Sequence, residues 1–398
     1  MRICGRFSLL LAFLLSGCVH SAPAAPPALV SAPVGPAPVK LAAGEQQFAG
    51  NLLVALEPQS KGITFSPSSL HECLTLAAMG AAGSTLQEFC SVLRLPTDFA
   101  AQLKGRSLPQ GVENADALFV DKRFKLSSGY SKTVTESTNA QIREVNFATP
   151  GPVLLEINDW IAKRTHDRIK DVLSRLDPTN VLVLVNAIYL KVDWMFPFKN
   201  EQTRPAPFFT GAQTLEKPAM HKEREFGYTV GSGWKMVELP YEGGHLAFDC
   251  LLPDEREGWR EVRQHLTDSA LTTAFQGLKP QQIQLQLPKF QQSSSLSLIP
   301  VLQSLGLHRA FGVGANFSGI SATPGVYISD VEQKCFVKVD EKGTEAAAAT
   351  VVSVSRALSV SAEKKAIPFI VDHPFFYFVR DLETGTIFFS GLVLEPES

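Results

Sequence analysis

The chain has 398 residues, of which 45% are hydrophobic and 19% are charged, and its formal net charge is −2. A chain of this length and apolar content can bury a large core, which excludes general disorder. The balanced charge excludes a strongly basic nucleic-acid coat and an acidic solvating tail, so no nucleic-acid partner is expected. Six cysteines without a CxxC pair are too few for a disulfide scaffold.

The first 17 residues have the layout of a secretory signal peptide. Arg2 and Arg6 precede the apolar run 7–15, which is too short to span a membrane. The run ends in Leu-Ser-Gly-Cys, which resembles a bacterial lipobox with Cys18 as the lipidated first mature residue. Val follows Cys18, where inner-membrane retention usually has Asp, so we expect an anchor in the outer membrane, on its periplasmic or outer face. The alternative is an ordinary signal peptide and a secreted protein.

The next segment is predicted to be a spacer. Residues 19–44 contain six prolines separated mostly by Ala, and Lys40 is their only formally charged side chain. Such a composition cannot bury a core and predicts an extended tether, which at about 3.1 Å per residue reaches roughly 60–80 Å. We therefore divide the chain into a signal peptide (1–17), a lipidated tether (18–44) and a single body (45–398).

The body contains segments of both regular periodicities. Helical spacing of apolar residues predicts helices over 70–95, with a break near Gly80 and Gly83, and over 156–173. The run 181–185 is continuously apolar, as in a buried central strand, whereas 282–287 alternates strictly, as in a strand with one wet face. Two further strands are expected at 246–252 and 387–394. The segments follow one another without a regular βαβ alternation, which indicates the α+β class.

No standard catalytic or metal-binding signature is present in the sequence. There is no GxSxG elbow and no Walker loop, and the pair Gly312 and Gly314 is followed by Phe317 at the third glycine position. His71-Glu72 lacks the second histidine of HExxH, because residue 75 is Thr. We therefore expect no enzyme activity, no metal and no cofactor. The cysteines of the body lie in apolar patterns and are predicted to be buried thiols, with pairing in an oxidising compartment left open: Cys73, Cys90, Cys250 and Cys335.

Residues 341–365 form the most informative segment. Small residues come first, β-branched residues follow, and Pro is absent until Pro368. Period-two alternation gives one small-to-apolar face, which would suit a strand that enters a narrow gap in a sheet. A short helix at 345–349 and a flexible surface loop are the alternatives, and the local pattern leaves all three open. The residues of the small-to-apolar face are Thr344, Ala346, Ala348, Thr350, Val352 and Val354.

Over residues 46–396 the sequence resembles the serpin family. The matching motifs are Phe65-Ser-Pro-Ser-Ser69, Asn186-Ala-Ile-Tyr189, Trp194, Glu238-Leu-Pro-Tyr241, Leu287-Pro-Lys-Phe290, Asn316-Phe-Ser-Gly319 and Asp372-His-Pro-Phe375. The stretch from Glu341 to Thr350 resembles the hinge of inhibitory members. The resemblance implies an α+β serpin fold, with three β-sheets, eight or nine helices and an exposed reactive loop at about 341–368.

The resemblance also implies a function. The protein would be a suicide-type inhibitor of serine proteases, with cysteine proteases as a further class. A protease would cleave the loop and form an acyl-enzyme, and the loop would insert into the main sheet and trap the protease. The alternative is a non-inhibitory carrier or chaperone-like protein of the cell envelope. Non-inhibitory members often have bulky, charged or Pro residues in the hinge, and this chain does not.

Site residues follow from the resemblance by position. The polar cluster beneath the opening sheet is implied at Ser66, Ser69 and Asn186. Gln333 stands where the family usually has a histidine; an amide can still donate and accept, but it cannot gain a charge, which puts pH gating here in doubt. Trp194 is implied at the point where the sheet opens, the breach. The hinge is implied at Glu341, Gly343, Thr344, Glu345, Ala346, Ala347, Ala348, Ala349 and Thr350.

The reactive bond is assigned by counting from the hinge. The common loop length places it between Ala357 and Leu358, which suits an elastase-like or subtilisin-like protease. A loop one residue shorter places it between Arg356 and Ala357, which suits a trypsin-like protease. The stretch from Ala357 to Pro374 is longer than the common pattern, which leaves Leu358 and the pair Lys364-Lys365 open as well. Basic residues are too sparse in 87–106 to predict heparin binding. We expect a monomer whose partner is the target protease and whose membrane contact is the lipid anchor alone.

Overall fold

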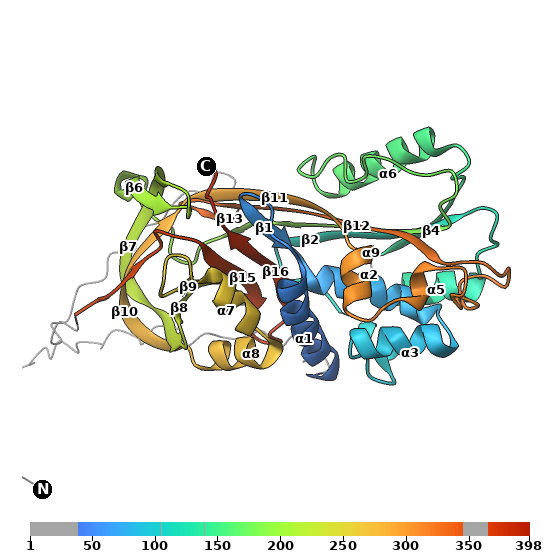
Figure 1. Ribbon diagram of the computed structural model, residues 1–398, viewed down its shortest axis with the longest axis horizontal. Helices are drawn as coiled ribbons and strands as arrows, with labels where there is room; N and C mark the ends of the chain where they lie inside the picture. Colours follow the sequence, from blue (N-terminus) through green and yellow to red (C-terminus); the bar gives the residue numbers. More distant parts are fainter. Residues whose placement is uncertain (1–38, 105, 139, 345–364) are drawn as a thin grey trace, which may run out of the picture. The chain divides into compact units, whose positions relative to one another are not determined.

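The computed structural model describes residues 39–104, 106–138, 140–344 and 365–398 (Figure 1). The predicted signal peptide, Cys18 and residues 345–364 lie outside the described residues. The described helices are α1 Val39–Ala55, α2 Pro67–Met79, α3 Gly83–Val92, α4 Phe99–Leu103, α5 Ser128–Ser137, α6 Pro150–Arg164, α7 Trp259–His265, α8 Asp268–Gln276 and α9 Ile299–Ser304, with short 3₁₀ helices at Asn200–Gln202 and Arg309–Phe311.

The predicted helix pair over 70–95 is confirmed as α2 and α3. Ser66 caps α2 by accepting a hydrogen bond from the backbone N–H of Ser69, and Pro67 occupies the first turn. At Gly80, where α2 ends, a Cβ would lie 2.3 Å from a side-chain carbon of Ile320. The break therefore lies where the chain must pack closely against a distant segment.

Two predicted boundaries were wrong. Helix α1 begins at Val39, and Leu41 is only 1% exposed, so the tether boundary predicted at residue 44 falls inside a packed helix. Helix α6 ends at Arg164 and does not continue to 173, because His166 and Asp167 have φ of 49° and 61°. These left-handed conformations stop the helix, although the buried residues beyond it keep helical spacing in the sequence.

The described strands form two hydrogen-bonded sheets. The first has the order β3-β2-β4-β12-β13-β5 with β11 paired to β12, and the second has the order β1-β16-β15-β9-β8-β7-β10-β14 with β6 paired to β7. The strands are β1 Gly62–Phe65, β2 Val112–Asp121, β3 Gln141–Val145, β4 Leu182–Leu190, β5 Val192–Asp193, β6 Arg204–Phe209, β7 Thr214–Gly231, β8 Trp234–Pro240, β9 Leu246–Pro253, β10 Lys279–Pro288, β11 Phe290–Ser297, β12 Ile328–Val339, β13 Gly343–Thr344, β14 Ile367–Ile370, β15 Phe375–Asp381 and β16 Ile387–Val393.

The expected third sheet is continuous with the second through β7. This strand of 18 residues pairs with β6 along its first part, with β10 along its middle and with β8 at its end. Counted by hydrogen bonds, the described strands therefore make two sheets, while the α+β class is confirmed. All four predicted strands are confirmed, as β4, β9, β10 and β16.

The central strand β4 is covered on both faces. Figure 1 shows α6 on one side of the first sheet and α2 on the other. Val183 and Val185 pack in a cluster with α6, whereas Leu182 and Leu184 pack in the cluster that contains α2. Burial on both sides explains why this strand is a continuous apolar run.

The first sheet is closed along the seam between β4 and β12. These strands run parallel, and their residues pair from Leu182↔Ile328 to Tyr189↔Phe336. At one end of the seam, the two-residue strand β13 lies between β12 and β5. The candidate site is built around this seam and this short strand.

Candidate functional site

The hinge begins at Glu341, which is held by two side chains from neighbouring segments. Lys289 Nζ lies 2.8 Å from Glu341 Oε2, and the hydroxyl of Thr203 donates to Glu341 Oε1 at 2.7 Å. Burial raises the pKa of Glu341, but the hydrogen bonds from Lys289 and Thr203 outweigh burial and hold this pKa below its ordinary value of 4.5. Glu341 is therefore an ionised anchor at the start of the segment.

Strand β13 is paired on both sides within the first sheet. Thr344 is 0% exposed and pairs with Val339 on β12 and with Val192 on β5. The adjoining Gly343 has no room for a side chain, because a Cβ would lie 2.2 Å from the carbonyl oxygen of Val192. Thr344 was predicted to lie in the exposed loop and to face the core only after insertion. That placement was wrong, because the backbone pairing to both neighbouring strands holds it inside the sheet.

An aromatic stack surrounds the breach. The ring of Trp194 stacks on that of Tyr241, with centroids 4.6 Å apart and planes 4° apart, and Trp194 Nε1 donates to the carbonyl of Asp340 at 2.8 Å. The hydroxyls of Tyr241 and Thr344 share a hydrogen bond, Oη to Oγ1, of 2.5 Å. Sequence reasoning missed the role of Tyr241, although a buried tyrosine in a motif signals a hydroxyl that needs a partner.

The predicted polar cluster is assembled across the seam. Gln333 on β12 stands directly opposite Asn186 on β4 and donates to Asn186 Oδ1 at 2.5 Å. Gln333 also accepts from the backbone N–H of Ser66 and donates to its carbonyl, both at 2.9 Å. Ser66 and Ser69 lie at the start of α2, so the cluster joins this helix to β4 and β12.

Asp116 on β2 completes the cluster and was not predicted. Its carboxylate accepts hydrogen bonds from Asn186, from the Ser69 hydroxyl at 3.1 Å and from Asn114 at 2.8 Å. Burial, with a smaller contribution from Glu72, raises the pKa of Asp116 well above 3.8. The hydrogen bonds from its neutral donors lower this pKa but do not offset the effect of burial. The pairing register of β2 with β4 is the signal that identifies Asp116, because this register places it opposite Asn186.

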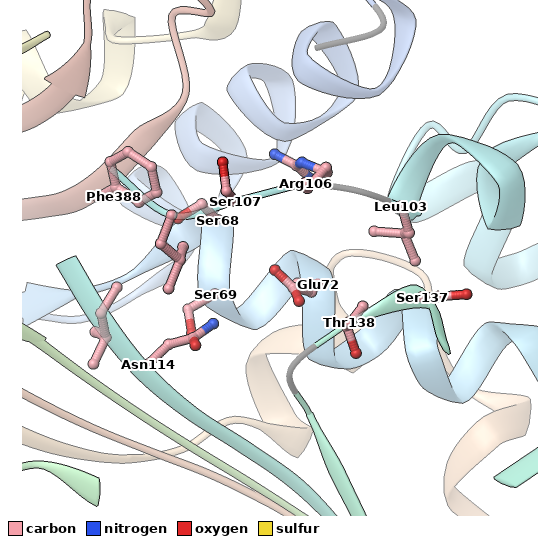
Figure 2. A pocket seen from close by; sticks show the side chains of 12 residues that line it. Ser68, Ser69, Glu72, Leu103, Arg106, Ser107, Asn114, Ser137, Thr138 and Phe388 are labelled. Atoms are coloured by element: carbon pink, nitrogen blue, oxygen red, sulfur yellow. The ribbon is translucent and has the colours of Figure 1, made fainter. Parts of the chain in front are cut away.

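A small cavity whose lining includes Glu72 and Arg106 adjoins the cluster. Figure 2 shows Ser69 and Glu72 on α2, Asn114 on the facing strand and Arg106 nearby. The cavity has an accessible volume of about 40 Å³, which is enough for a few water molecules and too small for an organic ligand. Arg106 forms two hydrogen bonds with Glu45, at 2.5 and 3.1 Å. Burial raises the pKa of Glu72, Arg106 lowers it and Glu45 raises it, with a net result of about 7.

The predicted site residues that the structure describes lie together in two places. Ser66, Ser69, Asn186 and Gln333 form the polar cluster, and Trp194, Glu341, Gly343 and Thr344 meet at the breach. The other predicted residues lie outside the described part of the chain: Cys18, Glu345, Ala346, Ala347, Ala348, Ala349, Thr350, Arg356, Ala357 and Leu358. Within the described residues, Cys73, Cys250 and Cys335 are buried free thiols and Cys90 is a half-buried one.

Comparison with known proteins gives matches over nearly the whole body. The family model "Serpin (serine protease inhibitor)" matches residues 43–396. "Uncharacterized serpin-like protein TK1782" of Thermococcus kodakarensis is 36% identical, covering 88% of this chain and 84% of its own. Iripin-2 of Ixodes ricinus is 34% identical, covering 89% and 93%. The crystal structure of Serpin48 of Tenebrio molitor matches with a TM-score of 0.82 and 27% identity, covering 90% of this chain and 98% of that one.

Proposed function

Because the chain belongs to the serpin family, we propose that it is a suicide-type inhibitor of serine proteases, with cysteine proteases as a further class of target. One observation carries the proposal. Strand β13 is already inserted at the end of the β4–β12 seam and leads directly into the segment that begins at residue 345. A loop attached at this point can extend β13, so the first strand pairs of the inserted strand already exist.

The chemical step is that of ordinary proteolysis. The serine Oγ of the protease attacks the carbonyl carbon of the scissile bond, the amine of the next residue leaves with a proton, and an acyl ester remains. The ester links the protease to the part of the loop that begins at Thr344. Cleavage therefore releases this part from its second attachment at residue 365 and leaves it free to insert.

Insertion has a favourable hydrogen-bond balance. The β4–β12 ladder breaks, and the inserted strand forms a ladder with each of the two strands in its place. Because β13 runs antiparallel to β12, and β12 runs parallel to β4, the new strand is antiparallel to both. One additional ladder is the driving force, and the closed seam keeps the uncleaved chain in its trapped state.

Alternation from Thr344 assigns the side chains of the inserted strand. Thr344 points to the buried side, against Tyr241, so alternate residues along the strand take the same side. Small and β-branched side chains fit such a face without overpacking. These residues are Ala346, Ala348, Thr350, Val352 and Val354.

The proposed reactive bond is Ala357–Leu358, with Arg356–Ala357 as the alternative. The first favours a protease whose pocket takes small side chains, and the second a protease whose pocket carries a carboxylate. Both bonds fall in the segment that separates β13 from β14. The mass of the released C-terminal peptide discriminates between them.

The test is incubation of the purified protein with elastase-, subtilisin-, trypsin- and papain-like proteases, followed by a denaturing gel. We expect a complex that survives denaturation with at least one of them, together with a peptide that begins at Leu358 or Ala357. Clean cleavage without a complex would contradict inhibition and would favour the carrier function. Catalytically inactive protease is the control, because it can bind but cannot form the ester.

We also propose that the protein is exported and held at the outer membrane by a lipid on Cys18, with secretion as the alternative. No helix in the described part of the chain is long and apolar enough to cross a membrane. The proposal is supported by the sequence of residues 1–18. In a bacterial host, metabolic labelling with a fatty acid should mark the wild type and not C18S; equal labelling would contradict the anchor.

A further inference from the structure

Tyr241 lies where the hinge enters the sheet and is fixed by both its backbone and its ring. Its backbone forms an isolated antiparallel bridge with Trp194, and its N–H donates to the carbonyl of Leu246 at 2.9 Å. Its ring stacks on Trp194. Tyr241 is 0% exposed. The hydroxyl therefore has a position set by the scaffold and not by the hinge.

That hydroxyl is bonded to Thr344, the last described residue of the hinge. Thr344 is 0% exposed, and its Oγ1 shares a hydrogen bond with Tyr241 Oη. Burial raises the pKa of Tyr241 far above its ordinary value of 10, so the hydroxyl stays protonated. Each hydroxyl is therefore the hydrogen-bond partner of the other at a buried position.

We propose that Tyr241 is a positioning residue that latches Thr344 in the sheet before cleavage, and so decides how often a cleaved loop inserts before the ester is hydrolysed. The inference rests on the proposed inhibitory function. Insertion and hydrolysis of the acyl-enzyme compete, and the faster step decides whether the protease is trapped or released. A hinge held in the sheet starts insertion without first forming its initial strand pairs.

The hydrogen bond predicts an unusual pattern of variants. Y241F keeps the ring and leaves the buried Thr344 hydroxyl without its partner, whereas T344V keeps the shape and leaves the Tyr241 hydroxyl without one. Each single variant therefore penalises the inserted hinge, since a buried polar group without a partner is costly. The double variant buries neither hydroxyl and should insert more readily than either single variant.

The chain offers a matched control in Tyr377. Its hydroxyl is also buried and donates to Thr64 Oγ1 at 2.6 Å, and its ring stacks on Phe248 with centroids 5.6 Å apart. Tyr377 belongs to the same aromatic cluster as Tyr241, but its hydroxyl does not bond the hinge. Y377F thus removes a comparable buried hydrogen bond and leaves the latch intact.

The first readout is hydrogen exchange of the uncleaved protein, which needs no protease. Peptides that cover residues 339–344 should exchange faster in Y241F and in T344V than in the wild type. Exchange there should be unchanged in Y377F and should slow again in Y241F/T344V. Equal exchange in Y241F and the wild type would overturn the latch.

The second readout is the stoichiometry of inhibition, the number of inhibitor molecules consumed for each protease trapped. We expect the ratio of cleaved to trapped inhibitor to rise about three- to tenfold in Y241F and T344V, as for loss of one buried hydrogen bond. The ratio should stay at the wild-type value in Y377F, fall back in the double variant, and be restored in T344S, which keeps the hydroxyl.

The two readouts separate the latch from the function on which it rests. If the wild type traps no protease, the proposed function fails, while the exchange experiment still tests the contact. If the wild type traps protease and Y241F matches it in both readouts, the latch fails and the proposed function stands. Additive effects of Y241F and T344V would also overturn the latch, because they would mean that the two hydroxyls act separately.

Discussion

At the scale of single residues, the proposed inhibition depends on the side chain of Thr344. It is fully buried, and its hydroxyl is hydrogen-bonded to that of Tyr241. T344R would bury an unpaired charge, so we expect the loop to be cleaved normally but not to insert, and the protease to be released. A denaturing gel should show cleaved inhibitor and no complex. Trapping by T344R at wild-type stoichiometry would contradict the insertion model.

A second residue-scale prediction concerns the charge of Glu341. Its lowered pKa means that the folded state favours the carboxylate, so its contribution to stability is present at neutral pH and disappears as pH falls through that pKa. E341Q should lower the free energy of unfolding by about 1.5–3 kcal/mol at pH 7, the value of a hydrogen bond to a charged group. Denaturant titrations should show the difference shrinking below pH 4.5.

K289M is the partner control for Glu341. It removes the ammonium that lies 2.8 Å from the carboxylate, so the double variant E341Q/K289M should lose less than the sum of the two single variants. Additive losses would mean that the two side chains do not stabilise the hinge as a pair.

At the scale of elements, the acidic side chains between α2 and β2 predict a pH dependence that Gln333 cannot supply. The pKa of Glu72 is raised from 4.5 to about 7, so the folded state holds a proton that the unfolded state releases. The protein therefore loses stability as pH rises through this window, and the loss is complete above it. Arg106, Glu45 and Asp116 interact electrostatically with Glu72, whereas the lowered pKa values of Glu45 and the buried His71 act on stability in the opposite direction.

The test compares the wild type with E72Q between pH 5 and pH 8. The variant should gain stability relative to the wild type as pH rises, since an amide has no proton to lose. E257Q, which changes an exposed glutamate, should follow the wild type throughout. A difference between E72Q and the wild type that is constant with pH would rule out Glu72 as the titrating group.

The elements also show where sequence patterns succeed. The break at Gly80 was predictable because two glycines interrupt a helical spacing, and β10 because Ile283, Leu285 and Leu287 alternate with glutamines. The end of α6 was not predictable from the sequence, because the helical spacing of buried residues continues past the left-handed residues that end the helix. The burial of Thr344 was not either, because β5 and Tyr241, which hold it, are distant in the sequence.

The polar cluster also contains residues that the sequence predicted and one that it did not. Ser66, Ser69, Asn186 and Gln333 were identified through family motifs, whereas Asp116 became evident only when β2 paired with β4 in a register that places it opposite Asn186. A carboxylate among polar residues of a strand carries no local mark of burial. Its role depends on pairing, which is a property of the sheet.

At the scale of the whole molecule, we propose that the first sheet holds the start of its next strand in β13. Of the first sheet's strands, β4 and β12 are joined along one seam, and β13 marks where a further strand would grow. A ladder of about ten added hydrogen bonds at roughly 1 kcal/mol each would stabilise the inserted form by about 10 kcal/mol. For a body of this size, that corresponds to a rise in melting temperature on the order of 20 °C.

The most direct test of the central claim is the melting temperature of the protein before and after a protease cuts within residues 345–364. Loop insertion predicts a rise on the order of 20 °C in the cleaved wild type and little or no rise in cleaved T344R. A cleaved wild type that melts at the same temperature as the intact protein would contradict the account, because its loop would have gained no place in the sheet.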